Sequence, residues 1–322
     1  MNGAIPEDAT VFMFPGQSSR YPDMFERLAS QAPEQTREVL GLASEILERD
    51  LAAHYRADNP AIFASNCDVQ LGVFLASHVH LVAAERAGLR ARLSLGLSLG
   101  EYNHLVHIGA LDFADAVRLV NARGAAYEAG PPGAMASVFP LEGDDVQAVL
   151  KRVRAMRPWV IEVANLNSPT QCVIAGDAQA IAAAGEIFER EHGVEPIMIE
   201  PRIAMHSSLF APVAEVFSQV VSRVRFRPSK RPYLPNVTGR LEPDPTPDRI
   251  RALLTAHVIS PVRFRHSIEL IASLAPRATF VEVGPRSVLY NLLSRKWLSN
   301  RRLRTDTPEG PLALAAAQAV AS

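Results

Sequence analysis

The sequence predicts an α/β protein in which a parallel sheet covered by helices carries an inserted antiparallel subdomain. Short apolar runs recur at residues 10–14, 93–96 and 279–283, each close to stretches with a helical period. Between residues 133 and 199 the order changes to strand–helix–strand–strand–helix–strand, which is the ferredoxin-like βαββαβ arrangement. A length of 322 residues is long for one compact unit and short for two, which agrees with a large body and a smaller insertion.

The expected elements follow in chain order. Before the insertion we expect strands at 10–14 and 93–96 and helices at 22–56, 67–87, 98–106 and 112–128. Inside it we expect strands at 133–139, 160–164, 171–175 and 194–199, with helices at 144–156 and 178–192. After it we expect helices at 208–223, 246–256 and 264–274 and strands at 232–238 and 279–283.

The composition excludes several classes of function. A net charge of −1 gives no overall field that would draw the chain to nucleic acid or to an anionic membrane. Neither a glycine-rich phosphate loop nor a dinucleotide fingerprint is present. The N-terminus lacks a secretory pattern, and no apolar run approaches the roughly 20 residues of a membrane span. We therefore expect a cytoplasmic protein.

Cysteine and histidine spacing predicts no metal centre. Cys67 and Cys172 are far apart in apolar surroundings and belong to no Cys-x-x-Cys pattern, which favours two buried thiols. His104 and His107 are three residues apart on a predicted helix, but no carboxylate or cysteine completes a ligand set.

The strongest motif is Gly96-Leu-Ser98-Leu-Gly100, between a predicted strand and a predicted helix. A G-x-S-x-G sequence in that place is typical of a nucleophile elbow, in which glycines permit a tight turn and the serine stands at a helix N-terminus. Alone, the pentapeptide is equally compatible with a turn that caps a helix. Phe14-Pro-Gly-Gln17 supplies a second backbone segment able to approach a ligand closely, and His206 is the candidate base.

Together these pieces resemble the malonyl-CoA:acyl carrier protein transacylases and the related acyltransferase domains of polyketide synthases. The resemblance runs from Val11 to about Leu293. It rests on FPGQ (14–17), Gln70, GLSLGE (96–101), Arg123-Gly124, GAMASV (133–138), NLNSP (165–169), VIAG (173–176), His206, Asn236-Val237, SPVRF (260–264) and VEVGP (281–285). It implies an α/β-hydrolase-like catalytic body over 1–132 and 204–310, a ferredoxin-like subdomain over 133–203, and a C-terminal tail or linker over 311–322.

The resemblance also implies the roles of individual residues. Ser98 would attack a thioester carbonyl and His206 would take its proton, with the histidine oriented by a backbone carbonyl near Arg263. The backbone N–H groups of Gln17 and Leu99 would form the oxyanion hole. The acyl pocket would contain Gln70, Leu97, Arg123, Tyr127, Asn167 and Met205. In the family, the arginine at position 123 pairs with the malonyl carboxylate through a forked contact.

Four positions depart from the family pattern. Leu97 stands where the family has histidine, Ser18 replaces a glycine, Tyr127 replaces a methionine, and Met205 replaces phenylalanine or serine. Apolar side chains beside the serine favour an uncharged acyl group. The run GLSLGE is similar to that of acyl hydrolases in trans-acting polyketide systems, which clear acetyl and other stalled groups from carrier proteins.

We therefore expect hydrolysis of short, acetyl-type groups from acyl carrier protein through an acyl-Ser98 intermediate. The alternative is transfer of malonyl from CoA to carrier protein, and the third candidate is a non-catalytic domain that docks carrier proteins. An Arg123 that points into the pocket favours malonyl, whereas one held aside by Tyr127 or Glu101 leaves the pocket neutral.

The expected partners are an acyl carrier protein and an acyl thioester, not a nucleic acid or a membrane. The substrate would be carried on phosphopantetheine or CoA, and no bound cofactor is expected. Two basic clusters are candidate docking surfaces for an acidic carrier, one at Arg152, Arg154 and Arg157 and one at Arg295, Lys296, Arg301, Arg302 and Arg304.

Overall fold

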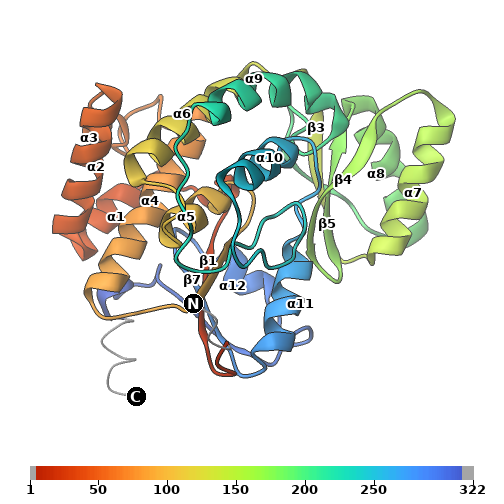
Figure 1. Ribbon diagram of the computed structural model, residues 1–322. Coiled ribbons are helices and arrows are strands. Elements are labelled where there is room, and N and C mark those ends of the chain that lie inside the picture. The colour runs from red at the N-terminus through yellow and green to blue at the C-terminus, as the bar shows by residue number, and fades with distance from the viewer. Residues whose placement is uncertain (1–4, 314–322) are drawn as a thin grey trace.

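The computed structural model describes residues 5–313, and its larger part is built on a four-stranded parallel sheet. The strands run in the order β2 (Leu93–Gly96), β1 (Thr10–Phe14), β7 (Thr279–Glu282) and β8 (Arg301–Arg304). Val11 to Phe14 are all buried, as expected of a central parallel strand covered on both faces. Figure 1 shows this sheet at the centre, with helices around it.

The helices that precede the insertion agree with the expectation except over 22–56, which is divided into three. They are α1 (Met24–Gln31), α2 (Pro33–Leu47), α3 (Leu51–His54), α4 (Asn66–Arg86), α5 (Gly100–His107) and α6 (Phe113–Glu128). The predicted helix at 22–56 is wrong as one element. Pro33 begins a new helix because proline suits a first turn, and Glu48 ends that helix in the left-handed region at φ 51°.

Helix α4 corrects the expectation that no apolar run is long enough to cross a membrane. It has 21 residues and a mean hydropathy of 1.4 over its most apolar window, which passes that test by length and composition. However, 83% of the window is buried inside the fold. A helix that is apolar all round is typical of a buried position, and α4 is the central core helix of the body.

A second, antiparallel sheet forms the insertion. Its strands run in the order β4 (Ile161–Ser168), β5 (Gln171–Gly176), β3 (Ala134–Val138) and β6 (Ile197–Glu200). Helices α7 (Gly143–Met156) and α8 (Ala178–His192) pack on it around a separate apolar core. The predicted ferredoxin-like βαββαβ arrangement is confirmed, and Figure 1 shows it to the right of the body.

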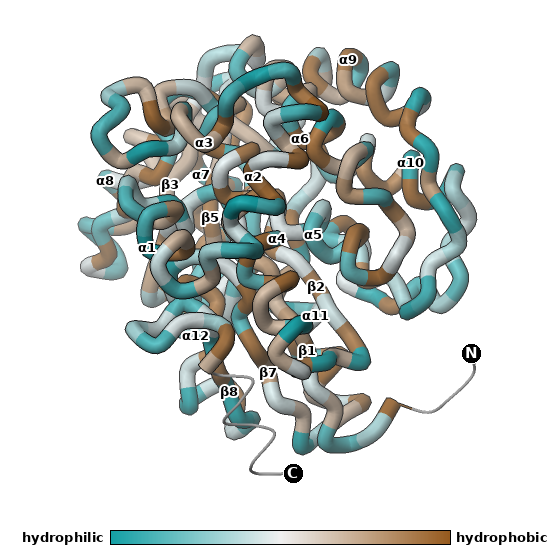
Figure 2. The backbone as a smooth tube through the Cα atoms, turned by 90° about the vertical axis from the view of Figure 1, so that its left-hand side faces the viewer, coloured by the Kyte–Doolittle hydropathy of each residue, from teal (hydrophilic) through white to brown (hydrophobic). Residues whose placement is uncertain are grey.

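The chain then returns to the body through α9 (Ala211–Ser222), α10 (Pro247–His257), α11 (Phe264–Leu274) and the short α12 (Val288–Leu292). In Figure 2, brown apolar stretches alternate with teal hydrophilic ones along most helices, which is the pattern of elements with one buried face.

Two strands also differ from the expectation. The predicted strand at 232–238 is wrong: only Tyr233 forms a bridge, to Glu242, because Pro232 and Pro235 supply no N–H groups for a ladder. Strand β8 was not predicted. The predicted residue boundaries of the two parts and of the tail at 311–322 stay predictions, and residues 314–322 lie outside the described part.

Candidate active site

The serine of the G-x-S-x-G motif lies on a sharp turn between β2 and α5. Ser98 has a φ of 49°, in the left-handed region that side chains rarely adopt. A Cβ on Gly96 would lie 2.0 Å from the Gly100 carbonyl carbon, so only glycine fits there. The helix begins at Gly100, two residues after the predicted start, because Ser98 belongs to the turn. The sequence therefore folds into an elbow that presents the hydroxyl at a helix N-terminus.

Ser98 and His206 are hydrogen-bonded, with 2.8 Å between Oγ and Nε2. The other ring nitrogen, Nδ1, lies 2.8 Å from the carbonyl oxygen of His257. A carbonyl can only accept, so Nδ1 carries the proton and Nε2 is free to accept from the serine hydroxyl. The prediction that this carbonyl lies near Arg263 is wrong, since it belongs to the last residue of α10. The backbone N–H of Arg263 instead donates to the carbonyl of Asn236.

Burial keeps His206 uncharged. Desolvation first, then the neighbouring His257 and Arg123, lower the pKa of His206 well below its ordinary value, while the hydrogen bond to the His257 carbonyl acts in the opposite sense. A neutral imidazole with its free nitrogen on a serine hydroxyl is the arrangement that a general base requires.

Two backbone segments meet beside Ser98, as the oxyanion-hole prediction requires. Gln17 is the first residue of the 3-10 helix Gln17–Ser19, and Leu99 is the N-cap of α5, so neither N–H has a partner within its own helix. A Cβ on Gly16 would lie 3.1 Å from the Leu97 carbonyl oxygen, which shows how closely the two segments approach. The roles of Gln17 and Leu99 stay predictions.

A cleft of about 920 Å³ opens over Ser98 and His206. The body contributes Gln17 and Leu97, and the chain returning from the insertion contributes Met205. The antiparallel sheet contributes an amide- and hydroxyl-rich wall made of Ser137, Asn165, Asn167, Ser168 and Gln171. Of the predicted pocket residues, the structure therefore places Leu97, Asn167 and Met205 in the cleft wall.

The other predicted pocket residues, Gln70, Arg123 and Tyr127, are buried behind the wall. The Arg123 guanidinium donates to Oε1 of Gln70 and lies 4.0 Å above the Tyr127 ring. Among residues 5–313 its buried Nη2 meets no hydrogen-bond partner in good geometry, although Arg123 also interacts with the hydroxyls of Tyr102 and Tyr127. The Tyr127 ring thus lies against Arg123, as one sequence hypothesis required, but an uncharged ring does not neutralise the guanidinium, so the charge expected to be masked is retained.

Sequence reasoning missed three residues around the serine and the histidine: Glu101, Asn236 and His257. Glu101 was expected only as a possible partner of Arg123, Asn236 only as part of a family segment, and no sequence pattern marks His257. Asn236 Oδ1 accepts the Ser98 backbone N–H at 2.8 Å, and Glu101 lies 3.0 Å from His257 Nδ1. Only the folded chain brings these residues together, since helix α10 and the 232–238 segment are distant from Ser98 in sequence.

Within residues 5–313, no group of three or more His, Cys, Asp or Glu residues could hold a metal ion. The rings of His104 and His107 each lie 2.7 Å from the hydroxyl of Ser94 in the core. The two rings thus share one hydroxyl as their hydrogen-bond partner.

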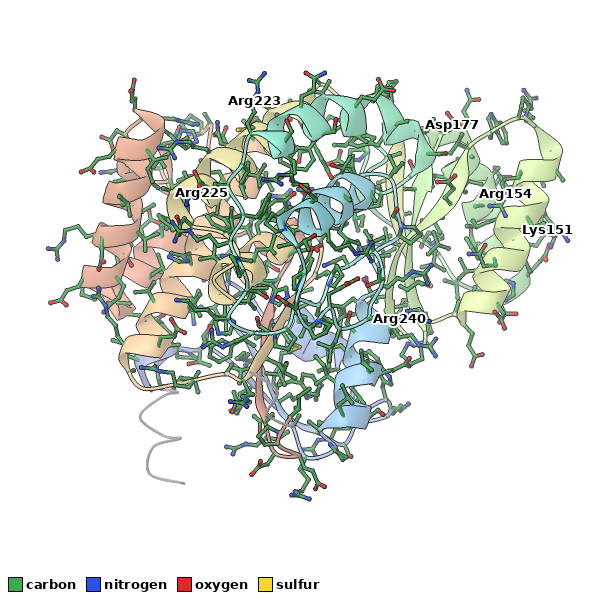
Figure 3. All side chains as sticks on the ribbon, viewed as in Figure 1. Lys151, Arg154, Asp177, Arg223, Arg225 and Arg240 are labelled. Atoms are coloured by element: carbon green, nitrogen blue, oxygen red, sulfur yellow. The ribbon has the colours of Figure 1, made fainter. Side chains whose placement is uncertain are left out.

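The two basic clusters are largely engaged locally. Arg302 and Arg304 lie 4.7 and 4.8 Å from the Tyr290 ring centroid, and Arg152 pairs with Glu191. Figure 3 shows Arg154 and Lys151 on α7 at the outer edge of the molecule, away from the sheet that leads to Ser98. Lys296 is the member of these clusters that lines the cleft.

The fold and the site together define an α/β enzyme that uses a serine–histidine pair beneath a cleft shared by two sheets. Comparison with known proteins specifies the family. The model of the acyl transferase domain matches residues 11–308, and the chain belongs to that family. It is an acyltransferase-family enzyme.

Individual relatives support this assignment along most of the chain. The malonyl CoA-acyl carrier protein transacylase of Bacillus subtilis is 31% identical over 305 residues, covering 94% of this chain and 93% of the relative. The polyketide biosynthesis protein ThaF of Burkholderia thailandensis is 33% identical over 97% of this chain, which spans 26% of that relative. FabD from Acinetobacter baumannii superposes with a TM-score of 0.88 at 27% identity, covering 99% of this chain and 100% of that one.

One solved structure includes a partner. It is a type II polyketide synthase acyl carrier protein in complex with its malonyl transacylase. This chain resembles the complex's matched chain with a TM-score of 0.86 at 27% identity, covering 97% of this chain and 100% of that one.

Proposed function

We propose that this enzyme transfers malonyl groups from CoA to an acyl carrier protein through an acyl-Ser98 intermediate. The observation that carries the proposal is the state of Arg123. Its side chain is 1% exposed, Nη1 donates to the neutral amide of Gln70, and Nη2 has no partner. Within the described part of the chain, no carboxylate neutralises this charge at hydrogen-bond distance.

A buried charge without a counter-ion costs several kcal/mol, so a protein that retains one gains when a ligand supplies the opposite charge. The Arg123 charge also contributes to the lowered pKa of His206, after burial and His257. Arg123 does not line the cleft, so pairing requires its guanidinium to turn toward a carboxylate at the far end of a short acyl group on Ser98. The bidentate geometry of arginine suits a carboxylate better than an uncharged acetyl group.

The chemistry divides into two matching halves. In the first, Ser98 Oγ bonds to the thioester carbon, its proton passes to His206 Nε2, and the C–S bond breaks so that the CoA sulfur leaves with that proton. In the second, the carrier thiol gives its proton to His206, its sulfur attacks the ester carbon, and the Ser98 oxygen leaves with the proton. The N–H groups of Gln17 and Leu99 would stabilise the negative oxygen in both halves.

The cleft suits a long, amide-containing carrier arm. Its wall of asparagine, glutamine and serine side chains offers hydrogen-bond partners that a phosphopantetheine arm can use, and Asn167 Oδ1 is buried without a partner. The relatives in this family include proteins named for acyl carrier protein, and one was solved bound to its carrier. An acyl carrier protein is therefore the proposed partner.

A second candidate, hydrolysis of short acyl groups from carrier protein, rests on Leu97. This apolar side chain lines the cleft beside Ser98 where the family has histidine, and Arg123 lies behind the wall. The sequence alone placed hydrolysis first. The unpaired Arg123 charge and the transacylase relatives reverse that order here.

Intact-protein mass spectrometry separates the candidates. The enzyme would be mixed with malonyl-CoA and empty carrier protein, and separately with acetyl-loaded carrier protein, with Ser98→Ala as the inactive control. We expect the wild type to transfer malonyl and the rate of transfer to fall at least about tenfold in Arg123→Ala, because that variant loses one charged hydrogen bond to the malonyl carboxylate. Arg118→Ala, an exposed arginine on the same helix that pairs with Asp115, is the matched control and should transfer normally.

Loss of acetyl from the carrier without malonyl loading would overturn the proposal in favour of hydrolysis. If neither reaction occurs and a fluorophosphonate probe does not label Ser98, the domain is a non-catalytic carrier-docking protein.

A further inference from the structure

A buried carboxylate lies next to the proposed catalytic pair without touching it. Glu101 is 0% exposed and sits one turn along from Ser98, at the start of α5. Its Oε1 accepts the hydroxyl of Tyr233, and its Oε2 lies 3.0 Å from Nδ1 of His257 and 3.4 Å from the backbone N–H of Asn236. The carboxylate is thus held by three donors from two separate segments.

His257 contacts His206 in two ways. Its main-chain carbonyl accepts from Nδ1 of His206 at 2.8 Å. Its ring is stacked on the His206 ring, with 4.8 Å between centroids and 23° between planes. The side chain of His257 is therefore placed on one side by Glu101 and covers His206 on the other, and its Nε2 is buried without a partner.

Asn236 connects the same carboxylate to the serine. Its backbone N–H faces Glu101, its Oδ1 accepts the Ser98 N–H at 2.8 Å, and its Nδ2 donates to the Gly96 carbonyl at 3.0 Å. The contacts close a ring, which runs through Ser98, His206, His257, Glu101 and Asn236 and back to Ser98.

We infer that Glu101 and His257 form a buried positioning pair that fixes the serine elbow and the histidine base relative to each other. Neither residue touches the substrate, so they act through Asn236 and His206. The inference rests on the proposed function only in requiring that Ser98 is the nucleophile and His206 its base, whichever acyl group is handled.

Stability alone is a weak explanation for this pair. Buried ion pairs contribute little net stability because desolvation offsets their attraction, and apolar replacements are often neutral or better. Buried polar pairs are better supported as devices that fix the relative position of two segments of the chain. Here one segment carries the serine, the other carries the carbonyl that orients the base, and Glu101 contacts both the His257 ring and the Asn236 backbone.

The pair should also set the protonation behaviour of His206. The charged and titratable groups around this cluster are Glu101 and Tyr102 on α5, Arg123 and Tyr127 on α6, Tyr233 in the loop, and His257 on α10. After burial, His257 is the main neighbour that lowers the pKa of His206. Loss of its imidazole should let His206 bind a proton at higher pH.

Fluorophosphonate labelling of the full chain is the test, because it reports Ser98 activation without any acyl substrate. Rates would be measured from pH 5 to 9 for the wild type, His257→Gln, Glu101→Gln and the double variant. His257→Gln keeps the main-chain carbonyl and removes only the ring. The matched control is His80→Gln, a buried histidine on α4 whose ring nitrogens have no hydrogen-bond partner among residues 5–313.

We expect each single variant to label roughly tenfold more slowly at pH 8, and the double variant to be no slower, because the two residues act as a unit. In His257→Gln the acid limb of the profile should move up by roughly one pH unit. His80→Gln should change thermal stability but keep the wild-type profile.

If the variants have unchanged pH profiles and only a lower melting temperature, the pair has a structural role alone. If the double variant's loss of labelling rate equals the product of the two single losses, the residues act independently. If Glu101→Gln does not fold, the His257→Gln profile still decides the question. If the wild type labels normally and the variants label slowly, but the wild type transfers no malonyl, the proposed function is removed and this inference stands.

Discussion

The α-carbon of Gly100 packs against the carbonyl oxygen of Phe14, so closely that a Cβ at position 100 would lie 2.1 Å from it. The contact joins the start of α5 to the end of β1, which lie next to Leu99 and Gln17, the two residues predicted to supply the oxyanion-hole N–H groups. The glycine therefore fixes the spacing of the elbow relative to the neighbouring strand.

Gly100→Ala should disrupt this spacing. The added methyl group meets backbone, which cannot move as a flexible side chain would, so we expect a loss of about 3 kcal/mol or more in the free energy of unfolding. Gly41→Ala is the control, because Gly41 lies on α2 with nothing within 4 Å of a Cβ. That change should stabilise by about 0.5–1 kcal/mol. Urea unfolding of both variants compares them directly, and equal midpoints would contradict the steric argument.

Mild acid should destabilise the protein through its buried histidines. Burial lowers the pKa of His78 and His80 to about 4 and of His104 and His107 to about 3. The unfolded chain binds protons at these groups near pH 6.5, so their contribution to stability is present above that pH and is lost as the pH falls towards 4 and 3. Glu282 acts in the opposite sense, because burial raises its pKa to about 8.

A single substitution isolates the contribution of one histidine to this pH dependence of stability. His80 is buried with no partner on either ring nitrogen, and in His80→Leu the stability lost between pH 7.5 and 5.5 should shrink by about 1 kcal/mol. Guanidinium unfolding at the two pH values gives the difference. An unchanged pH dependence would mean that His80 is protonated inside the fold.

Asn236→Ala should slow acyl-enzyme formation. It removes the acceptor of the Ser98 N–H and the donor to the Gly96 carbonyl, and an unsatisfied buried group costs about 1–3 kcal/mol. The control is Asn300→Ala. The Asn300 side-chain amide donates to the carbonyls of Pro276 and Ala278, which are distant from Ser98 in the sequence. Stopped-time mass spectrometry of the acylated protein measures the rate. A normal rate with lower stability would limit Asn236 to holding the turn.

Leu97→His tests what the departure from the family pattern does. Leu97 lines the cleft next to Ser98, and an imidazole there would offer a hydrogen bond to a polar or charged acyl group. We expect the ratio of malonyl to acetyl processing to rise about tenfold, equivalent to about 1.4 kcal/mol. Leu97→Met keeps the site apolar and should leave the ratio unchanged. A fall in the ratio after Leu97→His would mean that the leucine itself favours malonyl.

Local patterns were enough to predict both sheets. The apolar runs at 10–14, 93–96 and 279–283 are strands of the parallel sheet, and the βαββαβ order is correct. Strand β8 was missed because Arg301-Arg-Leu-Arg304 has the composition of a solvated face. It is an edge strand, where charged side chains are usual. The apolar letters of 232–238 suggested a strand, yet the N–H groups of Leu234 and Asn236 bond to side chains of α5.

The candidate site was predictable only as far as motifs extend. The elbow, His206 and the FPGQ segment have recognisable sequence patterns, and the structure brings them together. Contacts between distant segments have no such pattern: nothing in the letters around His257 indicates that its carbonyl reaches His206 or that its ring faces Glu101. The position of Arg123 behind the cleft wall likewise depends on how α4 and α6 pack.

The antiparallel sheet has an apolar core of its own beneath α7 and α8, while its other face adds Met135, Ala164 and Val173 to the core of the body, and a main-chain bridge between Asn165 and Val262 joins the two parts beside the cleft. Ser98 and His206 belong to the body, whereas much of the cleft wall that would contact the carrier arm belongs to the antiparallel sheet. Substitutions along β3, β4 and β5 can therefore change which cargo is accepted while the serine and histidine keep their distance. Such a division lets members of one family diversify in substrate without rebuilding their chemistry.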